Sequence, residues 1–131
     1  MKPNITLQNN PGFLGMASMT QDVPFICEGQ QQLMTLIVPN RDPNSGMNRR
    51  DPLIVFLQGS AWTSPNRYYQ LPQLCRYAQQ GFAVASITHR DCTKGNPFPA
   101  YLKDAKAAVR FLRSQADTMG IDPERVGFFG T

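Results

Sequence analysis

The sequence predicts an α/β fold, with a mostly parallel, doubly wound sheet flanked by helices. Three apolar runs bounded by turn residues, 52–57, 82–87 and 126–129, are typical of strands buried on both faces of a parallel sheet. Segments with a helical period, 68–80 and 101–119, separate them. This alternation predicts right-handed crossovers with helices on both faces of the sheet.

The N-terminal part predicts an arm followed by two strands. Residues 1–21 have no clear period and are predicted to form a surface arm, so the domain is expected to span 22–131. The β-like runs 23–27 and 33–38 predict a hairpin or two adjacent strands, and Pro24 favours an edge position for the first. A polar cluster at 40–51 predicts a loop.

The two helical segments differ in length but share an apolar face. The first, 68–80, places Leu71, Leu74, Cys75 and Ala78 on one side and ends before Gly81. The second, 101–119, repeats apolar residues three and four apart, and Gly120 fits its C-terminal cap. Residues 122–125 predict a turn before the last strand.

Composition excludes several function classes. The net charge is +4, but the basic residues are scattered and Arg49-Arg50 is the only adjacent pair, so no nucleic-acid partner is expected. Three separated cysteines and a single histidine, His89, argue against a disulfide framework and against a metal site. With no signal-peptide core and no apolar run of membrane-spanning length, we expect a cytoplasmic protein with reduced thiols.

Two short segments follow predicted strands, and each is a candidate for the catalytic or ligand-binding site. Residues 58–62 (Gln-Gly-Ser-Ala-Trp) follow the strand at 52–57, and Gly130-Thr131 follows the strand at 126–129. Ligands of open α/β sheets bind at the carboxyl ends of strands. Both segments are therefore candidate sites.

Four segments in colinear order resemble the α/β-hydrolase esterase/lipase family of the His-Gly-Gly-x-Trp type. Residues 52–62 are similar to its strand and His-Gly-Gly-x-Trp loop, and 81–90 to its next strand. Residues 98–113 are similar to the following loop and helix, and 120–130 to the approach to the nucleophile. The resemblance covers about residues 30–131, the N-terminal half of the domain.

The resemblance implies a serine carboxylic-ester hydrolase that acts through an acyl-enzyme. It assigns the oxyanion-hole amides to Ser60 and Ala61 and the tight turn to Gly59, and it makes Trp62 a wall of the substrate pocket or a buried anchor. Gly130-Thr131 would flank the nucleophile elbow Gly-x-Ser-x-Gly. The serine, acid and histidine would lie beyond Thr131. This chain alone is therefore expected to be inactive, with the C-terminal half of the domain as its partner, a small-molecule ester as substrate and no cofactor.

The sequence departs from the family at three positions. Gln58 replaces histidine, Ser60 replaces glycine, and His89 stands where tyrosine is usual. Gln58 can still hydrogen-bond to the loop backbone, whereas Ser60 narrows the conformations open to the turn.

Other interpretations of these residues remain open. Residues 59–61 could be a simple strand-to-helix turn, and Ser60 could be a nucleophile although no base is near it in sequence. His89 could be a catalytic base or a structural histidine, and Asp104 fits an ion pair or a solvated helix face. At the level of the protein, the alternatives are a non-catalytic α/β module that binds a ligand or a protein, and a peptidase of the same fold.

Overall fold

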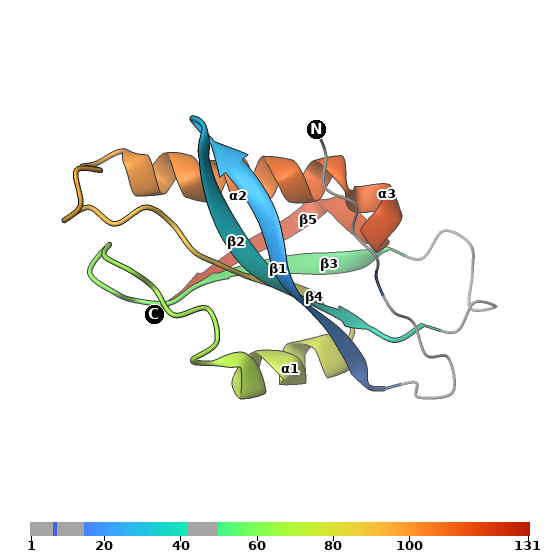
Figure 1. Ribbon diagram of the computed structural model, residues 1–131. Coiled ribbons are helices and arrows are strands. Elements are labelled where there is room, and N and C mark those ends of the chain that lie inside the picture. The colour runs from blue at the N-terminus through green and yellow to red at the C-terminus, as the bar shows by residue number, and fades with distance from the viewer. Residues whose placement is uncertain (1–6, 8–14, 42–49) are drawn as a thin grey trace.

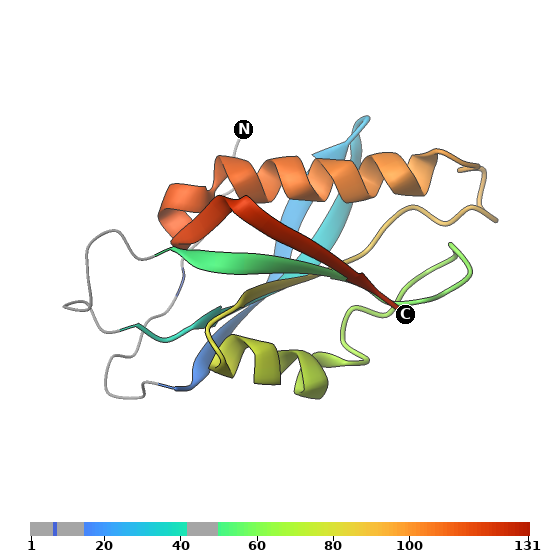
Figure 2. The same ribbon diagram turned by 180° about the vertical axis from the view of Figure 1, so that it is seen from behind.

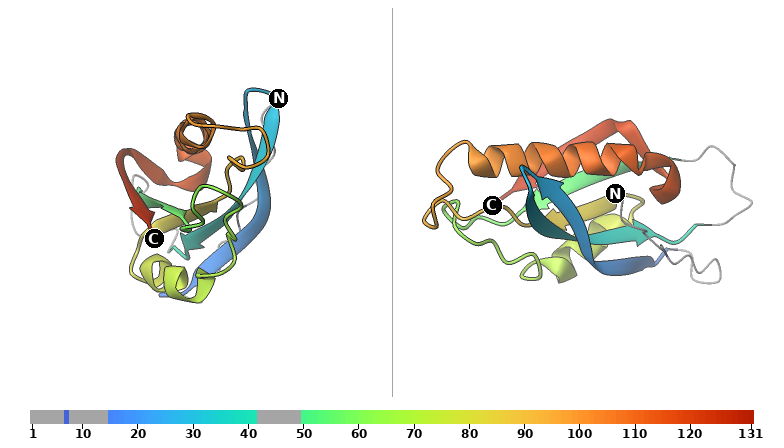
Figure 3. Two further views of the ribbon diagram at one scale, coloured as in Figure 1. Left: turned by 90° about the vertical axis from the view of Figure 1, so that its left-hand side faces the viewer. Right: turned by 45° about the horizontal axis from the view of Figure 1, so that its top comes forward.

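The computed structural model describes residue 7 and residues 15–41 and 50–131 as one twisted five-stranded sheet between helices (Figure 1). The elements in chain order are β1 (Ala17–Cys27), β2 (Gln30–Pro39), β3 (Asp51–Leu57), α1 (Leu71–Gln79), β4 (Ala83–Ile87), α2 (Ala100–Ser114), α3 (Ala116–Met119) and β5 (Ile121–Gly130). Figure 3 shows α1 on one face of the sheet and α2 on the other. The predicted fold class is confirmed.

The sheet is mixed rather than uniformly parallel. The strand order is β1-β2-β4-β3-β5; β3 pairs in parallel with β4 and β5, whereas β2 pairs antiparallel with β1 and β4. The parallel strands β3, β4 and β5 correspond to the three continuous apolar runs of the sequence. The antiparallel part has one strand, β1, at the edge of the sheet, where Pro24 was expected.

The N-terminal boundary differs from the predicted one. β1 begins at Ala17, so residues 17–21 of the predicted arm belong to the sheet. Their side chains are exposed or half-buried, and this mixture leaves no apolar pattern to detect. Of the remaining arm residues, Leu7, Gly15 and Met16 are described; residues 1–6 and 8–14, and residues 42–49 of the predicted loop, lie outside the described residues.

A tight hairpin joins β1 to β2. Glu28 and Gly29 form the turn with φ angles of 51° and 76°. Positive φ at both central residues is typical of the two-residue hairpin turn whose twist matches that of the strands. The hairpin alternative is therefore confirmed.

Side chains alternate between the two faces of the central strands, so each face carries its own core. The larger core faces α2 and includes Leu53 and Val55 of β3, Ala85 and Ile87 of β4, and Leu112 of α2. The smaller core faces α1 and consists of buried Ile37, Phe56, Leu74, Ala78 and Val84. Strands buried on both faces need apolar residues at every position, which explains the continuous runs in the sequence.

Two boundaries near the C-terminus differ in detail. The segment 101–119 forms α2 and the short helix α3, and Gly120 closes it with a φ of 65°, as predicted for a left-handed cap. The expected turn at 122–125 is instead an irregularity within β5, where the register with β3 jumps from Ile121 to Val126. The Glu124 amide donates to the Asp122 carboxylate at 2.9 Å, so the local turn chemistry is present inside the strand.

The chain leaves neighbouring strands toward opposite faces. β3 leads to α1 and the adjacent β4 leads to α2, as Figure 2 shows from behind. Such a point of divergence opens a crevice at the carboxyl ends of the strands. No helix among the described residues is both long and apolar enough to cross a lipid bilayer.

Candidate functional site

The two predicted site segments meet at the carboxyl edge of the sheet. Leu57 pairs with Gly130, and the Gly59 amide donates to the Thr131 hydroxyl at 2.8 Å. A cavity of about 250 Å³ lies between the segments. All residues of the two candidate segments line it, together with Leu57 at the end of β3: Gln58, Gly59, Ser60, Ala61, Trp62, Gly130 and Thr131.

Gly59 allows the two segments to come this close. A side chain at this position would overlap the carbonyl oxygen of Thr131. Only glycine therefore lets the loop after β3 lie against the end of β5. This contact brings the backbone of Ser60 and Ala61 next to Thr131.

The backbone of the loop is strained just after Ser60. Ala61 and Trp62 have φ angles of 53° and 63°, in the left-handed region that residues other than glycine, asparagine and aspartate rarely adopt. The Ser60 carbonyl is held by the Thr63 amide at 3.1 Å and by the Thr63 hydroxyl at 2.5 Å. Strain of this kind persists only where surrounding contacts hold it, and it is concentrated at functional sites.

The amides of Ser60 and Ala61 have no hydrogen-bond acceptor within the described part of the chain. The Gly59 amide, by contrast, is occupied by Thr131. Two adjacent unpaired amides at the wall of a cavity are chemically able to donate to an oxygen that carries negative charge.

Two hydrogen bonds close the loop that carries these amides. The Asn66 amide donates to the Gln58 side-chain oxygen at 2.6 Å, and the Cys92 amide donates to the Trp62 carbonyl at 3.0 Å. Gln58 thus bonds to the loop backbone, as expected for a residue in place of the family histidine. The second bond ties the loop to the segment after β4.

Trp62 stands at the mouth of the site and stacks on Tyr101 at the start of α2. The ring centroids are 4.4 Å apart and the planes differ by 9°. The indole remains 48% exposed, so it forms a wall rather than part of the core. This stacking partner could not be predicted from the sequence, because Tyr101 fits the helical pattern equally well as an ordinary surface residue.

His89 lies beneath this aromatic pair and is buried. Its Nδ1 donates to the Arg90 carbonyl at 2.8 Å, since a carbonyl can only accept, and its ring centroid is 6.0 Å from that of Trp62. Neither His89 Nε2 nor the Ser60 hydroxyl has a hydrogen-bond partner among the described residues. Within the described residues, no base is therefore bonded to Ser60 as a nucleophilic serine would require.

Asp104 forms a buried ion pair, one of the two alternatives considered for it. Its carboxylate accepts from the Arg90 amide at 2.7 Å and from Arg90 Nε at 3.1 Å, and the side chain is fully buried. The hydrogen bond to Asp104 raises the pKa of Arg90 above its usual value. Arg90 also donates to Glu28 at 3.0 Å, and this bond lowers the pKa of Glu28. The network joins the hairpin turn to the start of α2.

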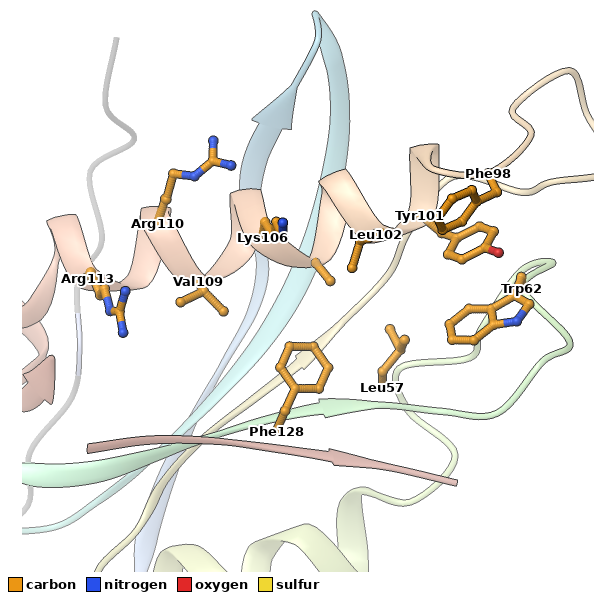
Figure 4. Close-up of a pocket in the computed structure, with 11 residues that line it drawn as sticks. Leu57, Trp62, Phe98, Tyr101, Leu102, Lys106, Val109, Arg110, Arg113 and Phe128 are labelled. Carbon is orange, nitrogen blue, oxygen red and sulfur yellow. The ribbon is translucent and has the colours of Figure 1, made fainter. Parts of the chain in front are cut away.

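A second, larger cavity of about 640 Å³ runs between α2 and the strands β3 and β5 (Figure 4). Phe128 points into it from β5 and is 53% exposed, while Leu57 and Trp62 are shared with the smaller cavity. Three basic side chains of α2 line its remaining side: Lys106, Arg110 and Arg113. The groove was not predicted as a site. The sequence predicted that the strand at 126–129 is buried on both faces, and this prediction is wrong for the described residues: Phe128 and Phe129 are 53% and 42% exposed because β5 lies at the edge of the sheet.

No group of three or more histidine, cysteine, aspartate or glutamate side chains within residues 15–41 and 50–131 is arranged to hold a metal ion. The three cysteines are free and half-buried.

Comparison with known proteins places the chain among α/β-hydrolases. Esterase LipQ of Mycobacterium tuberculosis is 27% identical over 115 residues, which cover 87% of this chain and 26% of LipQ. The carboxylesterase EstE1 from a metagenomic library matches with a TM-score of 0.74 at 20% identity, over 88% of this chain and 37% of EstE1. A truncated carbohydrate esterase from gut microbiota matches with a TM-score of 0.66 at 26% identity, over 88% and 40% of the two chains.

The chain thus spans about a quarter of LipQ and less than half of these solved esterases. A model of the BD-FAE family matches residues 42–131. Because this match covers more than half of the chain and the described fold agrees with it, the chain belongs to the BD-FAE family of α/β-hydrolases.

Proposed function

We propose that the complete protein hydrolyses a carboxylic ester through an acyl-enzyme, and that this chain supplies the oxyanion hole. The observation that carries the proposal is that the amides of Ser60 and Ala61, beside the end of β5, have no acceptor among the described residues. The strained backbone at Ala61 and Trp62 supports it, and so do the names of the relatives, which are esterases.

The proposed reaction assigns each group one task. A serine following Thr131 attacks the ester carbonyl carbon, and the π electrons of the carbonyl move onto its oxygen. The Ser60 and Ala61 amides donate hydrogen bonds to this oxyanion, Gly59 holds the turn against Thr131, and Trp62 bounds the substrate pocket. A histidine takes the serine proton and gives it to the alcohol oxygen as the carbonyl re-forms and the bond between the acyl carbon and that oxygen breaks. Water then attacks the acyl-enzyme, and the same steps release the acid and return the proton to the serine.

The serine, acid and histidine are proposed to lie in the remainder of a longer protein, since the relatives are much longer than this chain. The groove between α2 and β5 is the proposed contact with that remainder. A right-handed crossover from β5 to a further strand on its open side would place the connecting helix on the same face as α2. Such a helix would cover Phe128.

A cytoplasmic location is also part of the proposal, because three half-buried free cysteines suit a reducing compartment.

The test removes one amide hydrogen without changing a side chain. Replacing Ala61 by lactic acid in the complete protein turns the 60–61 amide into an ester and deletes the donor. We expect kcat to fall roughly 10²- to 10³-fold with KM nearly unchanged, the usual cost of one oxyanion donor. The matched control replaces exposed Gly95 by glycolic acid and should leave kcat within twofold. An unchanged kcat for the Ala61 variant would refute the oxyanion role.

A further inference from the structure

The loop that carries the proposed oxyanion amides is anchored at its far end by a buried arginine. Arg67 is 6% exposed, although arginine is rarely buried unless it is paired. It lies one residue after Asn66, whose amide bonds to Gln58 at the start of the loop. No step of the proposed reaction uses Arg67.

The Arg67 guanidinium is bonded to two strands at once. It donates to the Asp22 carboxylate and to the Gln21 side-chain oxygen of β1, the latter at 3.1 Å, and to the Thr35 hydroxyl of β2 at 2.7 Å. Thr35 in turn donates to Gln21 at 2.6 Å. The partners therefore form a closed network under the loop.

The backbone and ring neighbours of Arg67 add two more restraints. The Ser86 hydroxyl of β4 donates to the Arg67 carbonyl at 2.9 Å, and the guanidinium lies 4.5 Å from the centroid of the Tyr68 ring. Arg67 thus joins the loop to three strands of the sheet, β1, β2 and β4.

An irregularity in β1 directs the acidic partner toward Arg67. The pairing with β2 skips between Thr20 and Val23, and Asp22 has a φ of 57°. A bulge inserts an unpaired residue and redirects its side chain, and bulges are frequent beside active sites. Without it the ladder would continue regularly, and the side chains at 21 and 22 would point to opposite faces of the sheet.

The connection to the amides runs through one hydrogen bond. Asn66 and Gln58 close the base of the segment 58–66, and Ser60 and Ala61 lie inside it. Arg67 fixes the Asn66 side of this base, while β3 fixes the Gln58 side. A shift of Arg67 would therefore move the segment that carries the amides.

We propose that Arg67 is a positioning residue for the oxyanion loop, acting through Asn66 and Gln58. This inference rests on the proposed function. It assigns to the Arg67–Asp22 pair a role in the rate of the chemical step and not in substrate binding.

The experiment uses the complete protein and the variants Arg67→Lys and Asp22→Asn. Lysine keeps the charge but cannot reproduce the planar set of donors. We expect kcat per titratable serine to fall roughly 10- to 100-fold in Arg67→Lys, the range expected for a misplacement of about 1 Å, with KM within about twofold. The affinity for a trifluoromethyl ketone, which mimics the tetrahedral intermediate, should fall in parallel with kcat. Arg76→Lys on the exposed side of α1 is the matched control and should change none of these.

Asp22→Asn keeps the test valid if Arg67→Lys does not fold, because the Asp22 side chain is 65% exposed and its replacement leaves no buried gap. It should lower kcat less, with the same unchanged KM. Titration of the active serine counts the folded enzyme molecules. A merely structural role would lower that count and leave kcat per serine unchanged, whereas a positioning role lowers kcat per serine.

A double variant separates this inference from the proposed function. If Arg67 acts by placing the amides, combining Arg67→Lys with the Ala61 ester should lower kcat little further than the ester alone. If the ester lowers kcat but Arg67→Lys and Asp22→Asn leave kcat per serine unchanged, the positioning role is refuted and the oxyanion role stands. If the ester itself has no effect, both fail together.

Discussion

Two neighbouring loops leave the carboxyl edge of the sheet, and they are built in opposite ways. The loop after β3 holds Ala61 and Trp62 at positive φ, and the amides of Ser60 and Ala61 find no acceptor in the part of the chain that the structure describes. In the segment after β4, Arg90 bonds through its backbone and its side chain to the buried carboxylate of Asp104. The second segment is a structural anchor, whereas the first keeps polar backbone groups available at a cost in stability.

Hydrogen bonds join the segment after β4 to the loop after β3. The Cys92 amide donates to the Trp62 carbonyl, and the Ser64 hydroxyl donates to Asp91 at 2.8 Å. The anchored loop thus supports the strained one. If this division holds, substitutions in the anchor should affect folding, and substitutions in the strained loop should affect catalysis with little loss of stability.

The largest expected effect on stability comes from Asp104→Ala. Removing the carboxylate leaves the Arg90 guanidinium, 11% exposed, without its buried partner. We expect a loss of about 3–5 kcal/mol in the free energy of unfolding, measured with urea on the complete protein. Asp117→Ala is the control, because its side chain is 93% exposed and pairs with Arg50 at the surface; it should cost about 1 kcal/mol or less. Equal losses would mean that the segment after β4 is not an anchor.

A smaller effect of opposite sign is expected for Ala61→Gly. The left-handed conformation costs an alanine roughly 1–2 kcal/mol, and the greater freedom of glycine in the unfolded chain removes part of the gain. The free energy of unfolding should rise by up to about 1 kcal/mol. Ala108→Gly in α2, fully buried, should instead lower it by about 1 kcal/mol or more. A comparable loss in both variants would show that the loop is not strained.

The smallest effect concerns Glu28, which is exposed but bonded to Arg90. The hydrogen bond from Arg90 lowers the pKa of Glu28 below its ordinary value of 4.5, so the ionised carboxylate favours the folded state. This contribution is present above pH 4.5 and is lost as the pH falls through the lowered pKa. Wild type should therefore exceed Glu28→Gln in stability at neutral pH, and the difference should vanish in acid. A constant difference across the titration would contradict the assignment. Glu124→Gln, which removes an exposed carboxylate without an ion pair among the described residues, is the control.

The strands of the parallel part and the segments that follow them could be predicted because their signal is local. β3 and β4 are buried on both faces, and this requires the continuous apolar runs that the sequence contains. The candidate residues 58–62 and 130–131 follow from the ends of those strands. Parallel pairing of β3 with β5 then brings them together.

The supporting contacts could not be predicted because they depend on distant pairing. Arg67 bonds to residues 32 and 45 positions away, and neither a period nor a motif in the sequence links them. The start of β1 at Ala17 is hidden for a related reason, since an edge strand with exposed side chains needs no apolar pattern. Trp62 and Tyr101 meet only because α2 begins beside the loop after β3.

The most direct test of the oxyanion assignment is a crystal structure of the complete protein after reaction with a phosphonate ester. We expect a phosphonylated serine just beyond Thr131, with the phosphonyl oxygen about 2.7–3.1 Å from the amide nitrogens of Ser60 and Ala61. A phosphonyl oxygen bound by other donors, with these two amides turned away from it or bonded within the protein, would contradict the oxyanion assignment.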